Sequence, residues 1–355
     1  MTLRGLVGAG RPAACAGRFE LGADGWRMMV EALPRSTARL CGLWSDGMQV
    51  HALFHDGPGP FMASVAVPEG RYLALSPARP GAEAHERMLH DLWGIEAMGA
   101  VGTAPWLDQG QWGVTWPLRE RAPPAPPRLK GSSSLMARPW NARGHHAGPW
   151  PGGGWIPCAP ASAAGPAGEG ITQVRPRMGY AHRGLCARMR GNTLAGGARL
   201  AARIDAGATV AHQLAFARAV AAASGVDPSC PQAIFPAELE RVATHLDSVA
   251  QMAELQADGR LANLAATLLE HVRQLGHAVY GHRLLFDVVP RRDAAAPAPE
   301  VMAALHEGCA TLRRLFWRPR GLATQLLGRG VLSAGAARQW GSGAAWDGLR
   351  ASRRT

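Results

Sequence analysis

Residues 121–170 constrain the fold most, because they divide the chain into two parts. The segment reads "RAPPAPPRLKGSSSLMARPWNARGHHAGPWPGGGWIPCAPASAAGPAGEG", rich in Pro, Gly, Ser and Ala and without a helical or strand period. This composition is typical of linkers, since proline and glycine interrupt regular backbone structure. The sequence therefore predicts two domains joined by this connector, and its 355 residues are enough for both to form a core.

The part before the connector, residues 1–120, has the pattern of a small α+β domain. Apolar residues alternate in "ARLCGLWSDGMQVHALFHD" and "FMASVAVPEGRYLALS", with turn signals at SDG and PEG. A period of two predicts antiparallel strands. The following "GAEAHERMLHDLWGI" places Met88, Leu89, Leu92 and Trp93 on one stripe, which predicts a helix packed against the strands.

The part after the connector, residues 171–345, has the pattern of a mainly α-helical domain. Helical periodicity runs through "TVAHQLAFARAVAAA", "PAELERVATHLDSVAQMAEL" and "LANLAATLLEHVRQLGHAVYGHRLLFDVV". A further helix is expected from Pro299 to Trp317. The expected fold class is α+β, with a small α+β domain, a connector and a mainly helical domain.

Charge and cysteine content limit the function classes. The net charge is +12 and comes almost entirely from arginine, which attracts nucleic acid, anionic lipid or acidic proteins alike. The arginines are scattered, without a basic and aromatic run, so no nucleic-acid partner is predicted. The six cysteines form no CxxC pair and are expected to be free thiols in a reducing cytoplasm. No apolar run reaches the roughly 18 residues of a spanning helix, which predicts a soluble or peripheral protein.

Two groups of polar residues could carry chemistry. Glu238, Arg241 and His245 are three and four residues apart and share one helical face. They could form a proton-passing cluster if buried, or ion pairs on a solvated face. Asp205 and His212 lie seven residues apart and share a face if the helix begins early; otherwise Asp205 is an N-cap and His212 a surface or core residue.

Several segments in order resemble a known superfamily. They are "MGYAHRGL" at 178–185, "ARIDAGATVAHQLAFARAV" at 202–220, "AELERVATHL" at 237–246 and "GHRLLFDVV" at 281–289. This series resembles the large subunit of membrane-bound nickel–iron hydrogenases of the formate hydrogenlyase type, and the quinone-pocket subunit of complex I. In the N-terminal part, "ERMLHDLWGIEAMG" followed by "PWLDQGQWG" is similar to the end of the small accessory subunit of complex I. The resemblance implies an accessory domain fused in front of a large-subunit domain.

The resemblance predicts no nickel site. In hydrogenases the segment matching 203–212 has R-x-C-G-x-C and then a histidine, and its thiolates hold the metals. Here Asp205 and Ala208 stand at the cysteine positions, while Arg203 and His212 are kept. Aspartate and alanine cannot replace the soft thiolate ligands of such a centre. The second cysteine pair of hydrogenases has no counterpart here either, so the chain is similar to the cysteine-lacking, hydrogenase-related branch.

The complex I relatives suggest quinone-pocket residues. They carry an aspartate where Asp205 stands, which the resemblance places near the quinone head-group. The family tyrosine corresponds to Leu200, which cannot donate a hydrogen bond. The family histidine is matched only by "HHAG", which makes His146 the candidate. The chain itself is expected to bind no cofactor, and NAD and quinone are implied only for the whole complex.

The resemblance implies a subunit of a complex I-like or hydrogenase-related membrane redox complex, in the NADH:quinone oxidoreductase superfamily, that couples electron transfer to ion translocation. Its expected partners are a small iron–sulfur subunit, which holds the cluster, and antiporter-like membrane subunits. It would lie in the cytoplasm, peripherally on the inner face of the cell membrane. We hypothesise that Asp205, His212, Glu238, Arg241 and His245 form a buried polar network that relays charge or proton displacement.

A second interpretation stays open. The aperiodic segment 121–170 and the basic C-terminal tail depart from the relatives' pattern. The chain could therefore be a non-catalytic structural subunit, or a truncated or frameshifted remnant of a hydrogenase large subunit.

Overall fold

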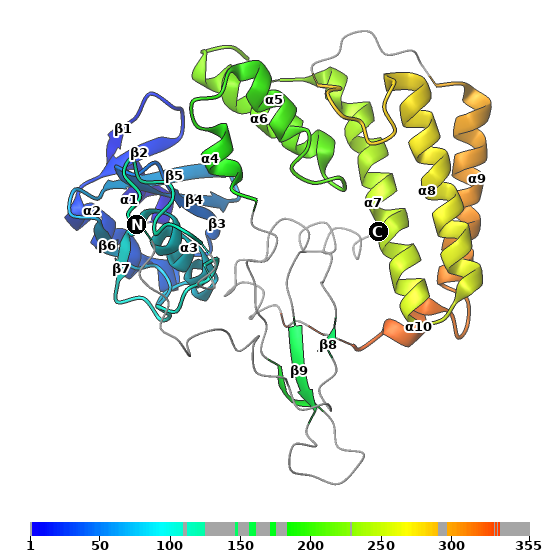
Figure 1. The fold of residues 1–355 in the computed structure, drawn as a ribbon, viewed down its shortest axis with the longest axis horizontal. Coiled ribbons are helices and arrows are strands. Elements are labelled where there is room, and N and C mark those ends of the chain that lie inside the picture. The colour runs from blue at the N-terminus through cyan, green and yellow to red at the C-terminus, as the bar shows by residue number, and fades with distance from the viewer. Residues whose placement is uncertain are drawn as a thin grey trace. The chain divides into compact units, whose positions relative to one another are not determined.

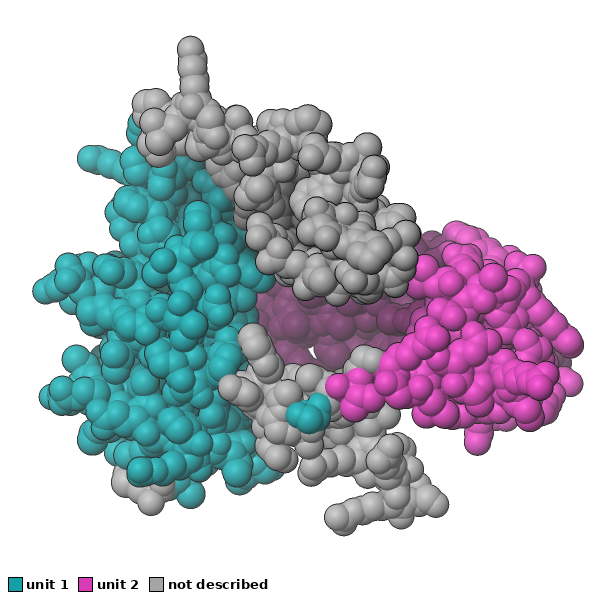
Figure 2. Space-filling model, turned by 90° about the horizontal axis from the view of Figure 1, so that it is seen from below, with its two compact units in different colours: residues 1–187, 332–355 teal, residues 188–331 magenta. Residues whose placement is uncertain are grey.

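The chain forms two compact units. The computed structural model describes residues 2–108, 112–124, 146–147, 156–160, 171–174, 183–227, 229–289, 297–329, 331 and 333. One unit comprises residues 1–187 and 332–355, and the other comprises residues 188–331 (Figure 2). The fold class is α+β, with a mixed sheet in the first unit and helices in the second (Figure 1). Of the predicted connector 121–170, only 121–124, 146–147 and 156–160 are described.

The first unit is built on a five-stranded sheet in the order β1-β2-β5-β4-β3. Its strands are β1 (Arg11–Pro12), β2 (Arg18–Leu21), β3 (Arg39–Ser45), β4 (Gln49–Asp56) and β5 (Gly59–Ala66). Helices α1 (Leu3–Gly8), α2 (Ala23–Ala32) and α3 (Glu83–Trp93) contact this sheet, and 3-10 turns cover Leu33–Arg35 and Pro80–Ala82. The remaining strands are β6 (Arg71–Leu73), β7 (Glu96–Met98), β8 (His146–Ala147), β9 (Ile156–Pro160) and β10 (Ile171–Val174).

The pairing of the strands is partly that expected from alternation. β3 with β4 and β4 with β5 are antiparallel, and their inward residues, such as Phe54 and Phe61, form the core with Trp26 of α2. In contrast, β2 runs parallel to β5, and β6 runs parallel to β7. The antiparallel pairing predicted from alternation is therefore confirmed for β3, β4 and β5 and wrong for β6, and β2 was not predicted. Alternation fixes which face of a strand is buried but does not fix its distant partner.

Two buried carboxylates on α3 hold the loops that follow the sheet. Oε1 of Glu86 accepts the backbone N–H groups of Leu75 and Ser76, at 2.5 and 3.0 Å. Oδ2 of Asp91 accepts those of Trp106 and Leu107, both at 2.7 Å. Asp91 begins the quoted D-L-W-G sequence, and the loop that it holds carries "PWLD". These two segments are thus joined by one carboxylate, which gives their pattern a structural reason.

The second unit consists of helices. They are α5 (Leu194–Ala201), α6 (Thr209–Ala223), α7 (Ile234–Leu255), α8 (Gly259–Tyr280), α9 (Pro299–Phe316) and α10 (Leu322–Leu326), with a 3-10 turn at Pro231–Ala233; the short α4 (Leu185–Met189) precedes them. Helices α7, α8 and α9 lie side by side, and α10 lies at the end where α7 passes into α8 (Figure 1). Their apolar faces share one core that includes Leu246, Leu261 and Leu312.

Helix α8 is shorter than its periodicity predicts. The apolar pattern continues to Val289, but the helix ends at Tyr280 because Gly281 takes a left-handed conformation with φ of 77°. His282 therefore lies beyond the helix. Within the described residues, no helix is both long enough and apolar enough to cross a membrane.

Replacing Asp91 by alanine should destabilise the first unit by about 2–4 kcal/mol, since the buried N–H of Leu107 and two half-buried N–H groups lose their acceptor. Burial opposes ionisation, but the hydrogen bonds from His90 and these N–H groups hold the pKa of Asp91 below its ordinary value. The stability that ionised Asp91 contributes to the first unit is thus present above about pH 4, and it is lost as the pH falls through the folded-state pKa of Asp91. Urea unfolding of the full chain between pH 3 and 7 measures it. The exposed Asp24→Ala is the control, and an equal effect of both variants would contradict the role of Asp91.

Candidate functional site

The segment 203–212, for which a resemblance to the metal-binding loop of hydrogenases is expected, contains the connection between α5 and α6 and the first turn of α6. Residues 202–208 form a turn, and Oδ1 of Asp205 accepts the N–H of Gly207 at 2.9 Å. The hydroxyl of Thr209 donates to the backbone carbonyl of Asp205 at 3.1 Å. Asp205 is exposed and His212, one turn into α6, is half-buried. Asp205 therefore shapes its own loop, and its carboxylate is open to solvent.

Helix α7 holds this segment through two side chains. The carboxylate of Glu240 accepts the N–H of Val210 and, at 3.0 Å, the N–H of Ala211, which are free donors at the start of α6. The hydroxyl of Thr244 donates to the carbonyl of Gly207 at 2.8 Å. The loop and the first turn of α6 are therefore fixed to α7 by hydrogen bonds.

The pKa of Glu240 lies above the ordinary value of a glutamate. Burial raises the pKa of Glu240, and the nearby charge of Asp205 raises it further. The two backbone hydrogen bonds and the positive charge of His212 offset part of this rise. The pKa of Glu240 thus depends on the charges of Asp205 and His212. A carboxylate of this kind takes up a proton closer to neutral pH than an exposed one does.

The segment 281–289 also meets this loop. Arg203 makes two hydrogen bonds with the carboxylate of Asp287, at 2.9 and 2.7 Å, and its guanidinium lies over the ring of Phe286. The buried amide of Gln213 donates to the carbonyl of Leu285 at 2.8 Å and accepts the N–H of Val289 at 3.1 Å. Three of the four resembling segments, 202–220, 237–246 and 281–289, are therefore in direct contact.

The predicted buried network is wrong for four of its five residues, since Asp205 is exposed as well. Glu238, Arg241 and His245 do share one face of α7, but that face is exposed. Glu238 and Arg241 form an ion pair on this solvent-exposed face. Spacing alone could not tell which side of α7 faces the core. The carboxylate that reaches the loop is Glu240, which sequence reasoning missed.

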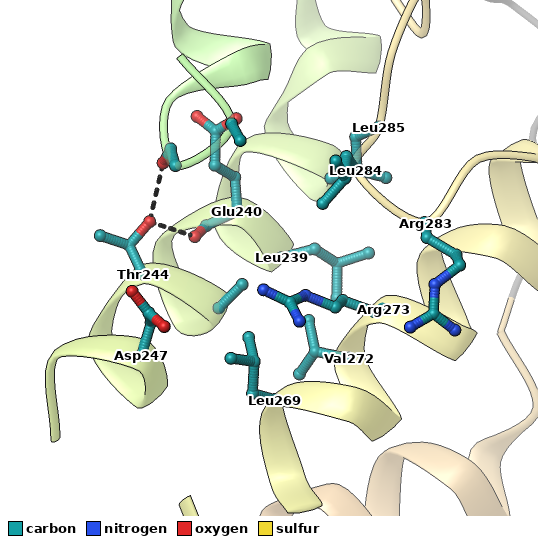
Figure 3. A pocket seen from close by; sticks show the side chains of 13 residues that line it. Leu239, Glu240, Thr244, Asp247, Leu269, Val272, Arg273, Arg283, Leu284 and Leu285 are labelled. Atoms are coloured by element: carbon teal, nitrogen blue, oxygen red, sulfur yellow. Dashed lines mark hydrogen bonds between the residues drawn. The ribbon is translucent and has the colours of Figure 1, made fainter. Parts of the chain in front are cut away.

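A cavity of about 170 Å³ lies beside this contact, between α7, α8 and the loop. Glu240, Thr244 and Asp247 line it from α7, and Arg273 lines it from α8 (Figure 3). Leucine and valine side chains form its apolar wall: Leu239, Leu269, Val272, Leu284 and Leu285. Arg283 also lines it but pairs with Glu270, at 2.7 and 2.6 Å. The cavity thus offers carboxylates on one side and a guanidinium on the other, which suits a small polar molecule.

A larger cavity of about 580 Å³ lies between α5, α6 and the end of the segment 281–289. Its wall is mostly apolar, with Leu194, Phe216 and Val220, and its polar lining residues are Arg199, Gln213, Ser224 and Asp287. Apolar walls with a few polar groups are typical of small-molecule sites. Asp205 lines neither cavity. The side chain of His146 lies outside the described residues, so a quinone contact of these two residues stays a prediction.

The described residues also bear on metal binding and nucleophilic catalysis. They contain no group of three or more His, Cys, Asp or Glu side chains arranged to hold a metal ion. In the first unit, Nδ1 of His51 lies 2.9 Å from Oγ of Ser64, and its Nε2 lies 3.3 Å from a carboxylate oxygen of Asp46. Ser64 is fully buried and also accepts from Arg18. No substrate can reach its hydroxyl, so this arrangement joins strands rather than catalysing a reaction.

Comparison with known proteins does not assign the chain to a family. The chain matches no model of a known protein family, and no curated protein matches it. The functional interpretation therefore depends on the residues themselves and on the resemblance of the quoted segments.

Truncating Glu240 should destabilise the second unit far more than truncating Glu238. Glu240→Ala leaves the partly buried N–H of Val210 and the exposed N–H of Ala211 without this acceptor, which costs about 1–3 kcal/mol. Glu238→Ala removes the same side chain two residues away on the exposed face, and little change is expected. Urea unfolding followed by circular dichroism compares the two. Equal losses would mean that Glu240 does not hold the loop.

Proposed function

We propose that this chain is a subunit of a complex I-like or hydrogenase-related membrane redox complex, and that it couples electron transfer to ion translocation without a nickel site. The observation that carries the proposal is the contact of the 203–212 loop with Glu240 of α7. This loop is the part of the chain that resembles the metal or quinone centre of the relatives. It meets a half-buried carboxylate whose pKa is raised and which responds to the charges of Asp205 and His212.

The proposed role of these residues is to take up or release a proton when the charge nearby changes. Electron arrival near the loop would alter the electrostatic potential at Glu240, because a half-buried carboxylate is screened less than an exposed one. A proton would then be taken up or released there. The electrons would come from the cluster of a small iron–sulfur partner subunit, and antiporter-like membrane subunits would move the ion. The complex would lie on the cytoplasmic face of the membrane, with NADH and quinone as reactants of the complex.

A structural role is the second candidate, and the exposure of Glu238, Arg241 and His245 favours it. Surface residues of this kind need not pass protons. In that case the contacts of Glu240, Gln213 and Arg203 only hold the helices together. The two candidates differ in what happens when a charge is removed without loss of stability.

Co-purification tests membership of a complex. The tagged full chain is isolated from the native membranes in mild detergent, and the proteins recovered with it are identified by mass spectrometry. An iron–sulfur subunit and antiporter-like membrane subunits are expected. Recovery of the chain by itself, from membranes in which it is present, would reject the proposal.

Asp205→Asn tests the coupling role. Asparagine keeps an oxygen that can accept the N–H of Gly207, so the loop should keep its shape, while the charge near Glu240 is lost. We expect the melting temperature to stay within about 2 °C and ion translocation by the complex to fall at least tenfold. Glu238→Gln, which removes a charge from the exposed face, is the matched control. Full translocation in the Asp205 variant would leave only the structural role.

A further inference from the structure

Arginines and large apolar side chains lie together at one end of the second unit. Between Glu307 and Asp347 the sequence has six arginines and no acidic residue. Arg313 and Arg314 lie in the last turn of α9, and Arg318, Arg320 and Arg329 flank α10. Figure 1 shows α10 at the end of the helices where α7 passes into α8. An ion pair of 2.8 Å between Arg318 and Asp258 fixes the segment after α9 to that α7–α8 turn.

The same end exposes four large apolar side chains. They are Leu255 at 83%, Trp317 at 63%, Leu327 at 71% and Val331 at 79% exposure. Single exposed apolar residues are ordinary on protein surfaces, but four at one end of a helix bundle are not. Their neighbours are exposed arginines: Arg260, Arg313, Arg320 and Arg329. We call these eight residues the basic end surface.

Few acidic groups oppose these arginines. The carboxylate of Asp258 is already paired with Arg318, and Glu254 is the remaining acidic residue of the last turn of α7. Within the described part of the chain, no ion pair is formed by Arg260, Arg313, Arg320 or Arg329. The surface is therefore positive and apolar at once.

We propose that the basic end surface binds the face of an anionic lipid bilayer. Tryptophan and leucine enter the headgroup region of a bilayer, while arginine keeps its guanidinium at the phosphates and lays its apolar stem along the surface. Arginines beside such a membrane each add to the attraction of its negative charge. A soluble acidic partner would satisfy the arginines but would leave the exposed apolar side chains without a role. This surface belongs to the chain itself and goes beyond the redox function proposed above.

Vesicle sedimentation of the purified full chain tests this surface. Vesicles of phosphatidylcholine with phosphatidylglycerol should bind the chain, vesicles of phosphatidylcholine alone should not, and added salt should weaken the binding. Arg320→Gln with Arg329→Gln should weaken it about 25-fold, since each arginine contributes about fivefold. The control removes two exposed arginines elsewhere, Arg35→Gln with Arg218→Gln, and should stay within about twofold.

The apolar part of the surface needs its own variant. Trp317→Ala with Leu327→Ala should weaken vesicle binding roughly tenfold, and Met48→Ala, an exposed side chain of the first unit, should not. Circular dichroism checks that each variant is folded. Absence of binding to anionic vesicles, or equal losses in the two arginine pairs, would overturn the proposal. The proposal would also be overturned if the chain bound soluble polyglutamate as tightly as it binds vesicles and Trp317→Ala with Leu327→Ala did not change that binding. That result would assign the surface to an acidic protein.

Discussion

The second unit depends on one carboxylate that accepts backbone N–H groups across two helices. Glu240 reaches from α7 to the first turn of α6, where helix geometry leaves donors without partners. This contact fixes the start of α6, and with it the turn that contains Asp205. Gln213, one turn further along α6, then holds the segment after α8 by hydrogen bonds to Leu285 and Val289. The three segments that resemble a redox subunit are thus brought together by polar side chains that satisfy main-chain groups.

In the first unit, carboxylates also accept backbone N–H groups, and their surroundings account for the different directions of their pKa shifts. Asp91 accepts three N–H groups and a hydrogen bond from His90, and these hold its pKa below the ordinary value despite burial. Glu86 accepts two N–H groups and a hydrogen bond from the side chain of Ser76, and Glu240 accepts two N–H groups, but burial prevails in both, so their pKa values are raised. The balance between burial and hydrogen bonds to the ionised form therefore sets the direction of each pKa.

The sequence predicted the elements better than it predicted their contacts. Alternation located the strands β3 to β5, and periodicity located α3, α7 and α9, because both patterns are local. The parallel pairing of β2 with β5 joins residues that are far apart in the chain and leaves no local pattern. In the site, the pattern of α7 did not single out Glu240. The buried stripe of α7 runs through Leu239, Leu246 and Ala250, and Glu238 and Glu240 flank Leu239 at equal angles, so only the tertiary contacts show which of the two meets α6.

The proposed coupling site and the basic end surface lie toward opposite ends of α7. Glu240 is in the second turn of this helix and Leu255 is its last residue, so a rise of 1.5 Å per residue separates them by about 22 Å along the helix axis. Such a distance exceeds the Debye length of about 8 Å at physiological ionic strength. The charge at Glu240 therefore has little direct electrostatic effect on lipid at the basic end surface. If both proposals hold, lipid binding positions the subunit, and coupling must pass through contacts with partner subunits or through movement of α7 itself.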